Sequence, residues 1–398
     1  MEIEEAVSVL TNALTPIEET EICQISEAYG RIAACDVFAP INVPPFAKSA
    51  MDGYAVRAAD LEGASAETPV ILNVTGQLFA GDWQKKVPEE GAIRVMTGSP
   101  VPNGFDAVVM QEDTDYGEKK VRIYKSVRAG QNYCALGEDI KKDSLVLKAG
   151  TKIGRAHVGL LASLGIAEIE VRRKVKVAII TTGSELLEAG KALASGKIYS
   201  SIAPMLSCAV QSAGQTVTVN QIVKDDEKEI FSAIKIAARQ ADIIITTGGV
   251  SVGKKDYLPE VLNSLAAQKL FSHVNIQPGT PTLASLLTGK LILSLSGNPY
   301  AALANFDIYF YHAISLLTGC EELSTQKKIA ILNTPYEKIN KLRRFVRAYF
   351  ENGFVNLPVE NHASSVISNL TECNCYIDFS AGKAFKKGDK VTVWMIKD

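Results

Sequence analysis

The sequence predicts a multidomain protein that combines an α/β domain with β-rich units. Its 398 residues are 47% hydrophobic and 22% charged, a composition that can form several buried cores. Strand-like and helix-like segments alternate over residues 175–317, whereas short β-rich runs fill residues 70–127 and the C-terminal part. These patterns predict a doubly wound α/β domain, a β-rich inserted domain, a helical and extended linker domain, and a small C-terminal β-barrel.

The N-terminal part predicts helices followed by a stiff segment. Apolar residues at helical spacing predict a helix over residues 3–14 and a second helical stretch over 25–34. Pro40, Pro44 and Pro45 then restrict the backbone and remove hydrogen-bond donors. We therefore expect an extended linker before Phe46.

Short β-rich runs separated by glycine, proline and acidic residues predict a small all-β domain. The runs are PVILNVTG (69–76), GAIRVMTG (91–98), DAVVMQE (106–112) and KKVRIYK (119–125). A helix predicted over 156–164 and a charged connector over 168–174 mark the end of this part.

The α/β pattern begins with VKVAIITTG (175–183), an apolar run typical of a strand buried on both faces of a parallel sheet. A helix from Ser201, a strand over 216–223 and a helix opened by Asp225 and Asp226 follow. Further units end with LILSLSGNP (291–299) and a helix over 300–317, and four short strands follow them. The predicted domains are 1–44 with 138–172, 45–137, 173–322 and 323–398.

Composition excludes several classes of protein. The 42 basic and 44 acidic side chains exclude a polybasic nucleic-acid-binding surface. No apolar run approaches the ~20 residues that span a bilayer, and the first ten residues are acidic, so we expect a cytoplasmic protein without a membrane segment. The seven scattered cysteines predict reduced thiols. The chain also lacks the Walker and G-x-G-x-x-G motifs.

Three predicted strands end in glycine turns. These are TTGSE (181–185), TGGVSVG (247–253) and SGNP (296–299). Glycine lets a phosphate approach the main chain, and the carboxyl ends of parallel strands meet at one edge, so the three turns favour a site for a phosphorylated ligand. Ordinary strand-to-helix turn chemistry is the alternative.

Acidic residues near these turns suggest a cation. Glu185, Asp225 and Asp256 would stand beside bound phosphates, and Mg²⁺ suits such a set of oxygen ligands. Helix capping is an equally good explanation for Asp225 or Asp226 taken alone.

Two segments of the first half also suggest a site. SAMDGYAVR (49–57) presents an acid beside a glycine after the stiff proline segment, and RVMTGSPVP (94–102) ends a strand in hydroxyl groups. A β-turn and a hairpin end are the alternatives.

Five motifs together resemble the molybdopterin molybdenumtransferases, the MoeA family that includes the C-terminal domain of gephyrin. In the order of the family, along nearly the whole chain, they are PPFAKSAMDGYAVR (44–57), RVMTGSPVPNGFDAVVMQE (94–112), TTGSELLEAGKALASGKIY (181–199), TTGGVSVGKKDY (246–257) and SGNPYAA (296–302).

The resemblance implies an elongated, four-domain homodimer with an α/β molybdopterin-binding domain. The active site would lie between this domain and the β-rich domain of the other subunit. The implied reaction depends on Mg²⁺: adenylylated molybdopterin binds, molybdate is inserted at the dithiolene, and hydrolysis releases AMP and molybdenum cofactor. Implied partners are the upstream molybdopterin adenylyltransferase and downstream molybdoenzyme chaperones.

Position within the matching motifs implies roles for individual residues. Asp52, Thr97 and Asp256 would be catalytic, and Asp52, Glu185 and Asp225 would be candidate metal ligands. The implied contacts of the pterin nucleotide are Gly183, Ser184, Glu185, Asp225, Gly248, Gly249, Ser251, Pro278, Gly279, Gly297, Asn298, Pro299, Arg347 and Ser365.

The chain departs from the family pattern at three turns. QPGTP (277–281) lacks the lysines of the usual K-P-G-x-P turn, SGNP (296–299) replaces P-G-N-P, and IYSSI (198–202) replaces I-Y-D-S-N. A lost charge weakens an anion contact. Two rival hypotheses therefore stand beside the transferase: a weakened paralogue that serves as a pterin-binding scaffold, and a related pterin-nucleotide pyrophosphate hydrolase.

Overall fold

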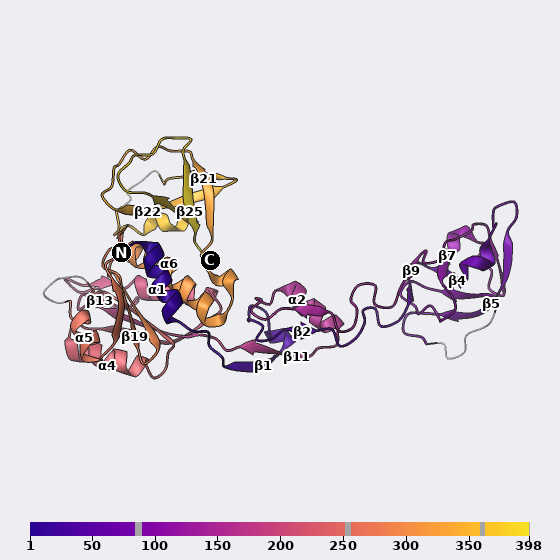
Figure 1. Ribbon diagram of the computed structural model, residues 1–398, viewed down its shortest axis with the longest axis horizontal. Coiled ribbons are helices and arrows are strands. Elements are labelled where there is room, and N and C mark those ends of the chain that lie inside the picture. Colours follow the sequence, from indigo (N-terminus) through magenta and orange to yellow (C-terminus); the bar gives the residue numbers. More distant parts are fainter. Residues whose placement is uncertain (84–89, 251–255, 359–362, 398) are drawn as a thin grey trace.

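The computed structural model describes residues 1–83, 90–250, 256–358 and 363–397. The chain is elongated, with an α/β unit and a C-terminal barrel at one end, a β-rich unit at the other end, and a small linking unit between them (Figure 1). None of the helices within these residues is long and apolar enough to cross a membrane.

The α/β unit contains a six-stranded sheet in the order β15-β12-β16-β20-β19-β17. Its first four strands are parallel, whereas β19 runs antiparallel to both neighbours. The strands are β12 (Lys176–Thr182), β15 (Thr216–Val223), β16 (Ile243–Thr247), β17 (Gln268–Ser272), β19 (Leu283–Leu287) and β20 (Lys290–Leu295). The parallel strands, which include β20 in the last predicted unit, confirm the predicted β-α-β pattern, and β19 and β17 extend the sheet beyond β20 through antiparallel pairs.

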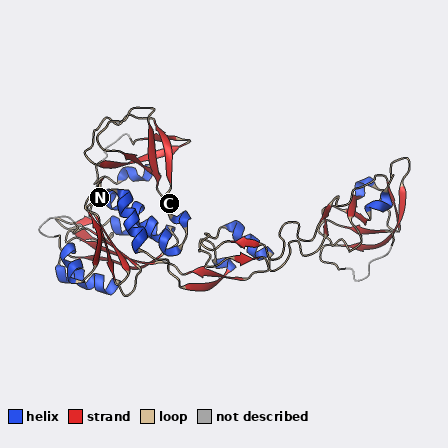
Figure 2. Ribbon diagram, viewed as in Figure 1, coloured by secondary structure: helices blue, strands red, loops and turns tan. Residues whose placement is uncertain are grey.

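Helices cover both faces of this sheet, as a doubly wound fold requires (Figure 2). One face packs against α1 (Ile3–Ala13), α3 (Ile202–Ser212) and α6 (Pro299–Thr318), and the other packs against α4 (Glu227–Ala237) and α5 (Leu258–Ser264). The alternating apolar residues of β12 explain this arrangement, because Val177 and Ile179 face the first group and Ala178 and Ile180 face the second. Helix α1 thus packs with the α/β unit, although the sequence analysis grouped it with the linker.

The linking unit pairs strand β1 (Thr20–Gln24) with β11 (Glu168–Arg172), and strand β2 (Val37–Phe38) with β10 (Leu145–Leu147), beside α2 (Arg155–Ser163). The expectation of a charged connector over 168–174 was wrong, because Ile169 and Val171 are buried on one face of β11.

The helix expected over 25–34 was also wrong. Only the 3-10 turn η1 (Ile25–Glu27) forms there. Gly30 then takes a left-handed φ of 78°, and Ile32 and Ala33 bridge to Lys152 and Val171. These long-range backbone bonds replace the local bonds of a helix.

The β-rich unit has a five-stranded sheet in the order β7-β4-β6-β5-β8. Its strands are β4 (Gly53–Val56), β5 (Val70–Leu78), β6 (Ala92–Val95), β7 (Ala107–Met110) and β8 (Lys120–Ile123), and the short pair β3 (Lys48–Ser49) and β9 (Tyr133–Cys134) lies beside it. Strand β4 was not expected as a strand. It is buried between β6 and β7, so the segment around Asp52, for which a β-turn was the alternative to a site, leads directly into a central strand.

The C-terminal strands form a closed five-stranded barrel in the order β22-β23-β21-β25-β24, with β24 pairing back to β22. They are β21 (Lys327–Leu332), β22 (Arg343–Glu351), β23 (Phe354–Asn356), β24 (Cys375–Phe379) and β25 (Lys390–Met395). The short strand β18 (Ile276–Gln277) of the α/β unit joins β22 in parallel. Arg343 further connects the barrel to α1, since it binds both Asp378 and Glu4.

Gly53 provides a test of the β-rich unit. A Cβ at this position would lie 1.8 Å from the carbonyl oxygen of Val109, so β4 and β7 would have to separate. We expect Gly53→Ala to lower the free energy of unfolding by about 2–4 kcal/mol, measured by urea denaturation with hydrogen exchange of β4 and β7 as a local probe.

A matched control is available in α2. Gly159 is helical, and nothing lies within 4 Å of the position of its Cβ. Gly159→Ala should therefore raise stability by about 0.5–1 kcal/mol. A Gly53→Ala variant as stable as the wild type would contradict the tight packing of β4.

Candidate functional site

A pocket of about 270 Å³ opens at the carboxyl edge of the parallel strands. It is formed by the ends of β12 and β16, the turns that follow β12, β15, β16 and β20, and the segment before α3. The lining residues are Thr181, Thr182, Gly183, Glu185, Leu186, Ile198, Tyr199, Ser200, Ser201, Ile202, Asp225, Thr247, Gly248, Gly249, Asp256, Gly297 and Pro299. The structure thus brings together the three predicted glycine turns and the three predicted acids.

Close backbone packing holds the turns at this edge. Gly248 has φ +88°, and a Cβ on it would lie 2.6 Å from the carbonyl oxygen of Thr182. A Cβ on Gly297 would lie 3.3 Å from the Cα of Gly248. Larger side chains at these positions would push the turns apart, so glycine is needed for the shape of the pocket.

The two neighbouring acids of the β15–α4 turn have different roles. Asp226 caps α4 by accepting a hydrogen bond from the backbone N–H of Glu229. Asp225 instead lines the pocket, and its Oδ2 accepts the backbone N–H of Ser184 at 2.8 Å. The hydroxyl of Ser184 in turn accepts the backbone N–H of Asp225. Ser184 therefore supports the wall of the pocket without lining it.

Four other predicted contacts lie outside this pocket. Pro278 and Gly279 form a turn against α6, where the amide of Asn305 donates to the carbonyl oxygen of Pro278 at 3.2 Å. Asn298 is the N-cap residue of α6, and its amide donates to the hydroxyl of Ser364. Ser365 is exposed on the same barrel loop. Ser251, a further predicted contact, lies outside the described residues.

Arg347 is buried in the barrel rather than in the pocket. Its guanidinium lies 4.4 Å above the ring of Tyr300, and one of its nitrogens donates to the carbonyl oxygen of Ala363. Burial lowers the pKa of Arg347. The residue joins β22, α6 and the loop at Ala363, and this arrangement gives it a structural role next to the α/β unit.

Asp52 and Thr97 form a separate cluster in the β-rich unit. The Oδ1 of Asp52 accepts the backbone N–H of Thr97 at 2.7 Å and its hydroxyl at 2.8 Å. These bonds, with the backbone N–H first, lower the pKa of Asp52. Within one chain the linking unit separates this cluster from the α/β unit (Figure 1). Asp52 therefore does not meet Glu185 and Asp225, its expected companions around a metal, in a single subunit.

The pocket suits a magnesium ion that is shared with a ligand. The described residues contain no group of three or more His, Cys, Asp or Glu side chains placed to hold a metal ion. Mg²⁺ is commonly bound by one or two carboxylates together with substrate phosphates and water, and Glu185 and Asp225 could supply such a pair. One oxygen of Asp225 is already engaged by Ser184.

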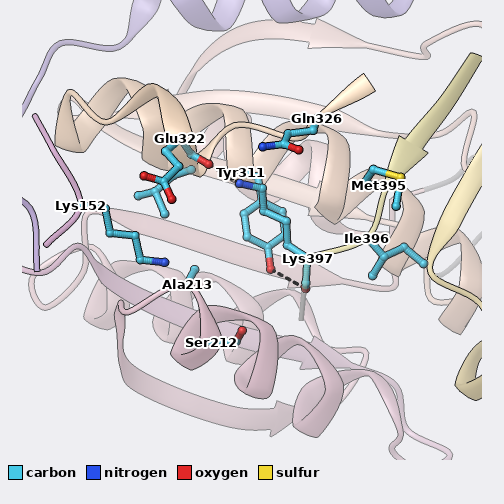
Figure 3. Close-up of a pocket in the computed structure, with 10 residues that line it drawn as sticks. Lys152, Ser212, Ala213, Tyr311, Glu322, Gln326, Met395, Ile396 and Lys397 are labelled. Carbon is cyan, nitrogen blue, oxygen red and sulfur yellow. Dashed lines mark hydrogen bonds between the residues drawn. The ribbon is translucent and has the colours of Figure 1, made fainter. Parts of the chain in front are cut away.

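A second cavity, of about 290 Å³, lies where the linker, α6 and the end of the barrel meet (Figure 3). Lys152, Glu322 and Lys397 line it beside the buried ring of Tyr311. Burial, and then the charge of Lys152, lower the pKa of Lys397. No residue predicted from the sequence to be functional lines this cavity.

Several residues of the main pocket were missed by the sequence analysis. Thr181 and Thr247 belong to the quoted motifs but received no role, and Tyr199 and Ser200 were named only as a departure from a pattern. Hydroxyl residues directly before a glycine turn were the available signal, since the last residues of parallel strands border the ligand edge.

The whole chain matches known proteins of one kind. Three family models match in order: the MoeA N-terminal region (domain I and II) over residues 1–165, a probable molybdopterin binding domain over 178–315, and the MoeA C-terminal region (domain IV) over 330–396. Curated molybdopterin molybdenumtransferases of Staphylococcus epidermidis and Staphylococcus aureus are 35% and 34% identical, each over 98% of this chain and 94% of the relative. This chain belongs to the MoeA family. The resemblance of the motifs is confirmed.

The fold of the family is confirmed as well. A crystal structure of the molybdopterin biosynthesis MoeA protein from Pyrococcus horikoshii superimposes with a TM-score of 0.85 at 30% identity, over 100% of both chains. A second structure of the MoeA protein from this archaeon gives a TM-score of 0.87 at 29% identity, over 100% of this chain and 99% of the other.

The bonds between Asp52 and Thr97 can be tested directly. Thr97→Val removes the hydroxyl donor but keeps the backbone N–H, which is the larger cause of the shift. The pKa of Asp52 should therefore rise but stay below its ordinary value of 3.8. A carboxyl-¹³C NMR titration measures this. Glu67 is the internal control, because its pKa is lowered by its own backbone N–H and by the hydroxyl of Ser65, which the substitution does not change. An unchanged pKa of Asp52 would mean that the hydroxyl does not bind it.

Proposed function

We propose that this MoeA-family protein inserts molybdate into adenylylated molybdopterin and releases AMP and molybdenum cofactor. Its place as a transferase in molybdenum cofactor biosynthesis follows from family membership along the whole chain. The observation that carries the finer proposal is the pocket at the carboxyl edge, where three glycine turns and three acids converge.

The chemistry of the pocket supports a diphosphate-linked ligand. Backbone N–H groups of tight glycine turns can approach phosphate oxygens closely. Glu185, Asp225 and Asp256 would repel those phosphates unless a cation lay between them, and we propose Mg²⁺ for this role. When bound, Mg²⁺ would neutralise negative charge on the phosphates during cleavage. Glu185 and Asp225 are the proposed protein ligands.

We further propose that Asp52 and Thr97 complete the site from a second subunit of a homodimer. Their unit lies far from the pocket of its own chain (Figure 1), so another copy would have to supply them. Asp52 is ionised at neutral pH, and the two bonds from Thr97 stabilise this charged form further, as its lowered pKa indicates. An ionised carboxylate fixed by two donors can orient the attacking water for hydrolysis of the adenylyl bond, while positioning supplies much of the rate.

Several features of the proposal derive from the family alone. They are the transient partners that deliver adenylylated molybdopterin and receive the cofactor. The division of the chain at residues 45, 138, 173 and 323 and the cytoplasmic location are proposals that rest on the sequence analysis. Gln277 and Thr280, where the family has lysines, would leave the neighbouring turn with a weaker anion contact.

The activity test uses purified protein, adenylylated molybdopterin, Mg²⁺ and molybdate, and follows both AMP release and cofactor formation. Asp52→Ala should keep the fold and reduce turnover on the order of 100-fold, because the carboxylate that orients water is removed. Glu62→Ala, which changes an exposed acid of the same unit, is the control. Wild-type turnover in Asp52→Ala would remove this residue from the site.

The same assay separates the rival functions. AMP release without molybdenum insertion would indicate a pyrophosphate hydrolase. Tight binding of adenylylated molybdopterin with neither product would indicate a scaffold. The curated relatives carry the transferase name and favour neither alternative.

Sharing of the site between subunits predicts complementation. An Asp52→Ala subunit keeps its pocket, and an Asp225→Ala subunit keeps its Asp52, so a mixed dimer should contain one intact site. Random mixing of the two inactive variants should restore about a quarter of wild-type activity. Mixtures as inactive as either parent would contradict a site built from two subunits.

A further inference from the structure

Two buried hydroxyl groups in the main pocket have no role in the site described so far. Thr181 is 2% exposed and Thr247 is fully buried, and both line the pocket. Within the described part of the chain, neither Oγ1 atom has a hydrogen-bond partner. Thr182 differs, because its hydroxyl donates to the carbonyl oxygen of Thr247.

The two hydroxyl-bearing residues stand next to each other at the ends of neighbouring strands. Thr181 of β12 and Thr247 of β16 are partners in the parallel register. They follow Ile179 and Ile245 on the sheet face that packs against α3 and α6. A buried hydroxyl without a partner is destabilising, and native structures rarely keep such groups unless water or a ligand satisfies them. Two side by side in a pocket therefore indicate a polar contact with the bound ligand.

The charge of the pocket indicates which part of the ligand makes this contact. Its described lining residues include Glu185, Asp225 and Asp256 but no lysine or arginine. A phosphate held against the two threonines would thus meet no positive side chain of this lining, whereas a neutral polar group requires none. A pterin ring offers such an edge, with amino and ring N–H donors for a carboxylate beside a carbonyl acceptor for a hydroxyl.

We propose that the hydroxyls of Thr181 and Thr247 bind the hydrogen-bonding edge of the pterin ring and help the protein to select it. This inference rests on the proposed function, because it assigns one part of the same ligand to the floor of the same pocket. The phosphates then lie along the glycine turns that follow the two threonines.

Valine has the shape of threonine without the hydroxyl, so Thr181→Val and Thr247→Val test the proposal. Both variants should unfold at the same temperature as the wild type or higher, because an unsatisfied buried hydroxyl is removed. Both should bind adenylylated molybdopterin and the competitor 6-hydroxymethylpterin about three- to tenfold more weakly. The competition constant of inorganic pyrophosphate should not change. Thr247→Ser, which keeps the hydroxyl, should retain most of the affinity.

Thr246 provides the matched control. It is fully buried, its hydroxyl has no partner among the described residues, and it precedes Thr247 on the same strand, but it does not line the pocket. Thr246→Val should therefore share the effect on stability and leave binding unchanged.

Three results would overturn the inference. They are wild-type affinity for the pterin ligands in both pocket variants, an equal loss of this affinity in Thr246→Val, or a loss of affinity for pyrophosphate alone. Failure of the wild-type protein to bind adenylylated molybdopterin would be a different result, since it would remove the proposed function itself.

Discussion

The parallel pairing of β12, β16 and β20 is the constraint on which the pocket depends. Thr181 pairs with Thr247, and Thr247 pairs with Leu295, so the three strands end at one level. The turns after them must then meet, and glycine at 248 and 297 lets their backbones approach closely. A register shift of one residue would turn the two threonines to the opposite face of the sheet and dismantle the floor of the pocket.

The described lining of the pocket carries acidic side chains without basic ones. Of the two adjacent acids, Asp226 is used by the helix it caps, and only Asp225 reaches the pocket. Together with Glu185 and Asp256 it makes a negative wall, and the described lining supplies no positive side chain. For the proposed phosphorylated ligand, these carboxylates would require a cation between themselves and the phosphates.

Local patterns in the sequence were sufficient for the α/β unit and its ligand edge, because strand ends, glycine turns and helix starts are encoded by neighbouring residues. They were insufficient where distant segments decide the structure. Residues 168–172 look like a charged connector until β1 pairs with them, and residues 30–34 look helical until their backbone bonds to segments more than a hundred residues away. The separation of Asp52 from the acids of the pocket depends on the arrangement of whole units, and no local pattern records it. The burial of Arg347 against Tyr300 could not be predicted for a similar reason, since it requires the barrel to dock on α6.

One charged cluster sets how the linking unit leaves the α/β unit. Arg173, directly after β11, binds Asp242 through two nitrogens at 2.7 and 3.1 Å and Glu19 through a third at 2.6 Å. Asp242 in turn accepts the backbone N–H of Lys176 at the start of β12. Asp52 lies at the far end of the chain from this cluster (Figure 1). A rotation of the linking unit by a few degrees at Arg173 would therefore displace the carboxylate of Asp52 by a much larger distance than it would displace residues near the cluster. The bonds among Arg173, Asp242 and Glu19 thus restrain the chain at the point from which the position of Asp52 is most sensitive to a change in angle.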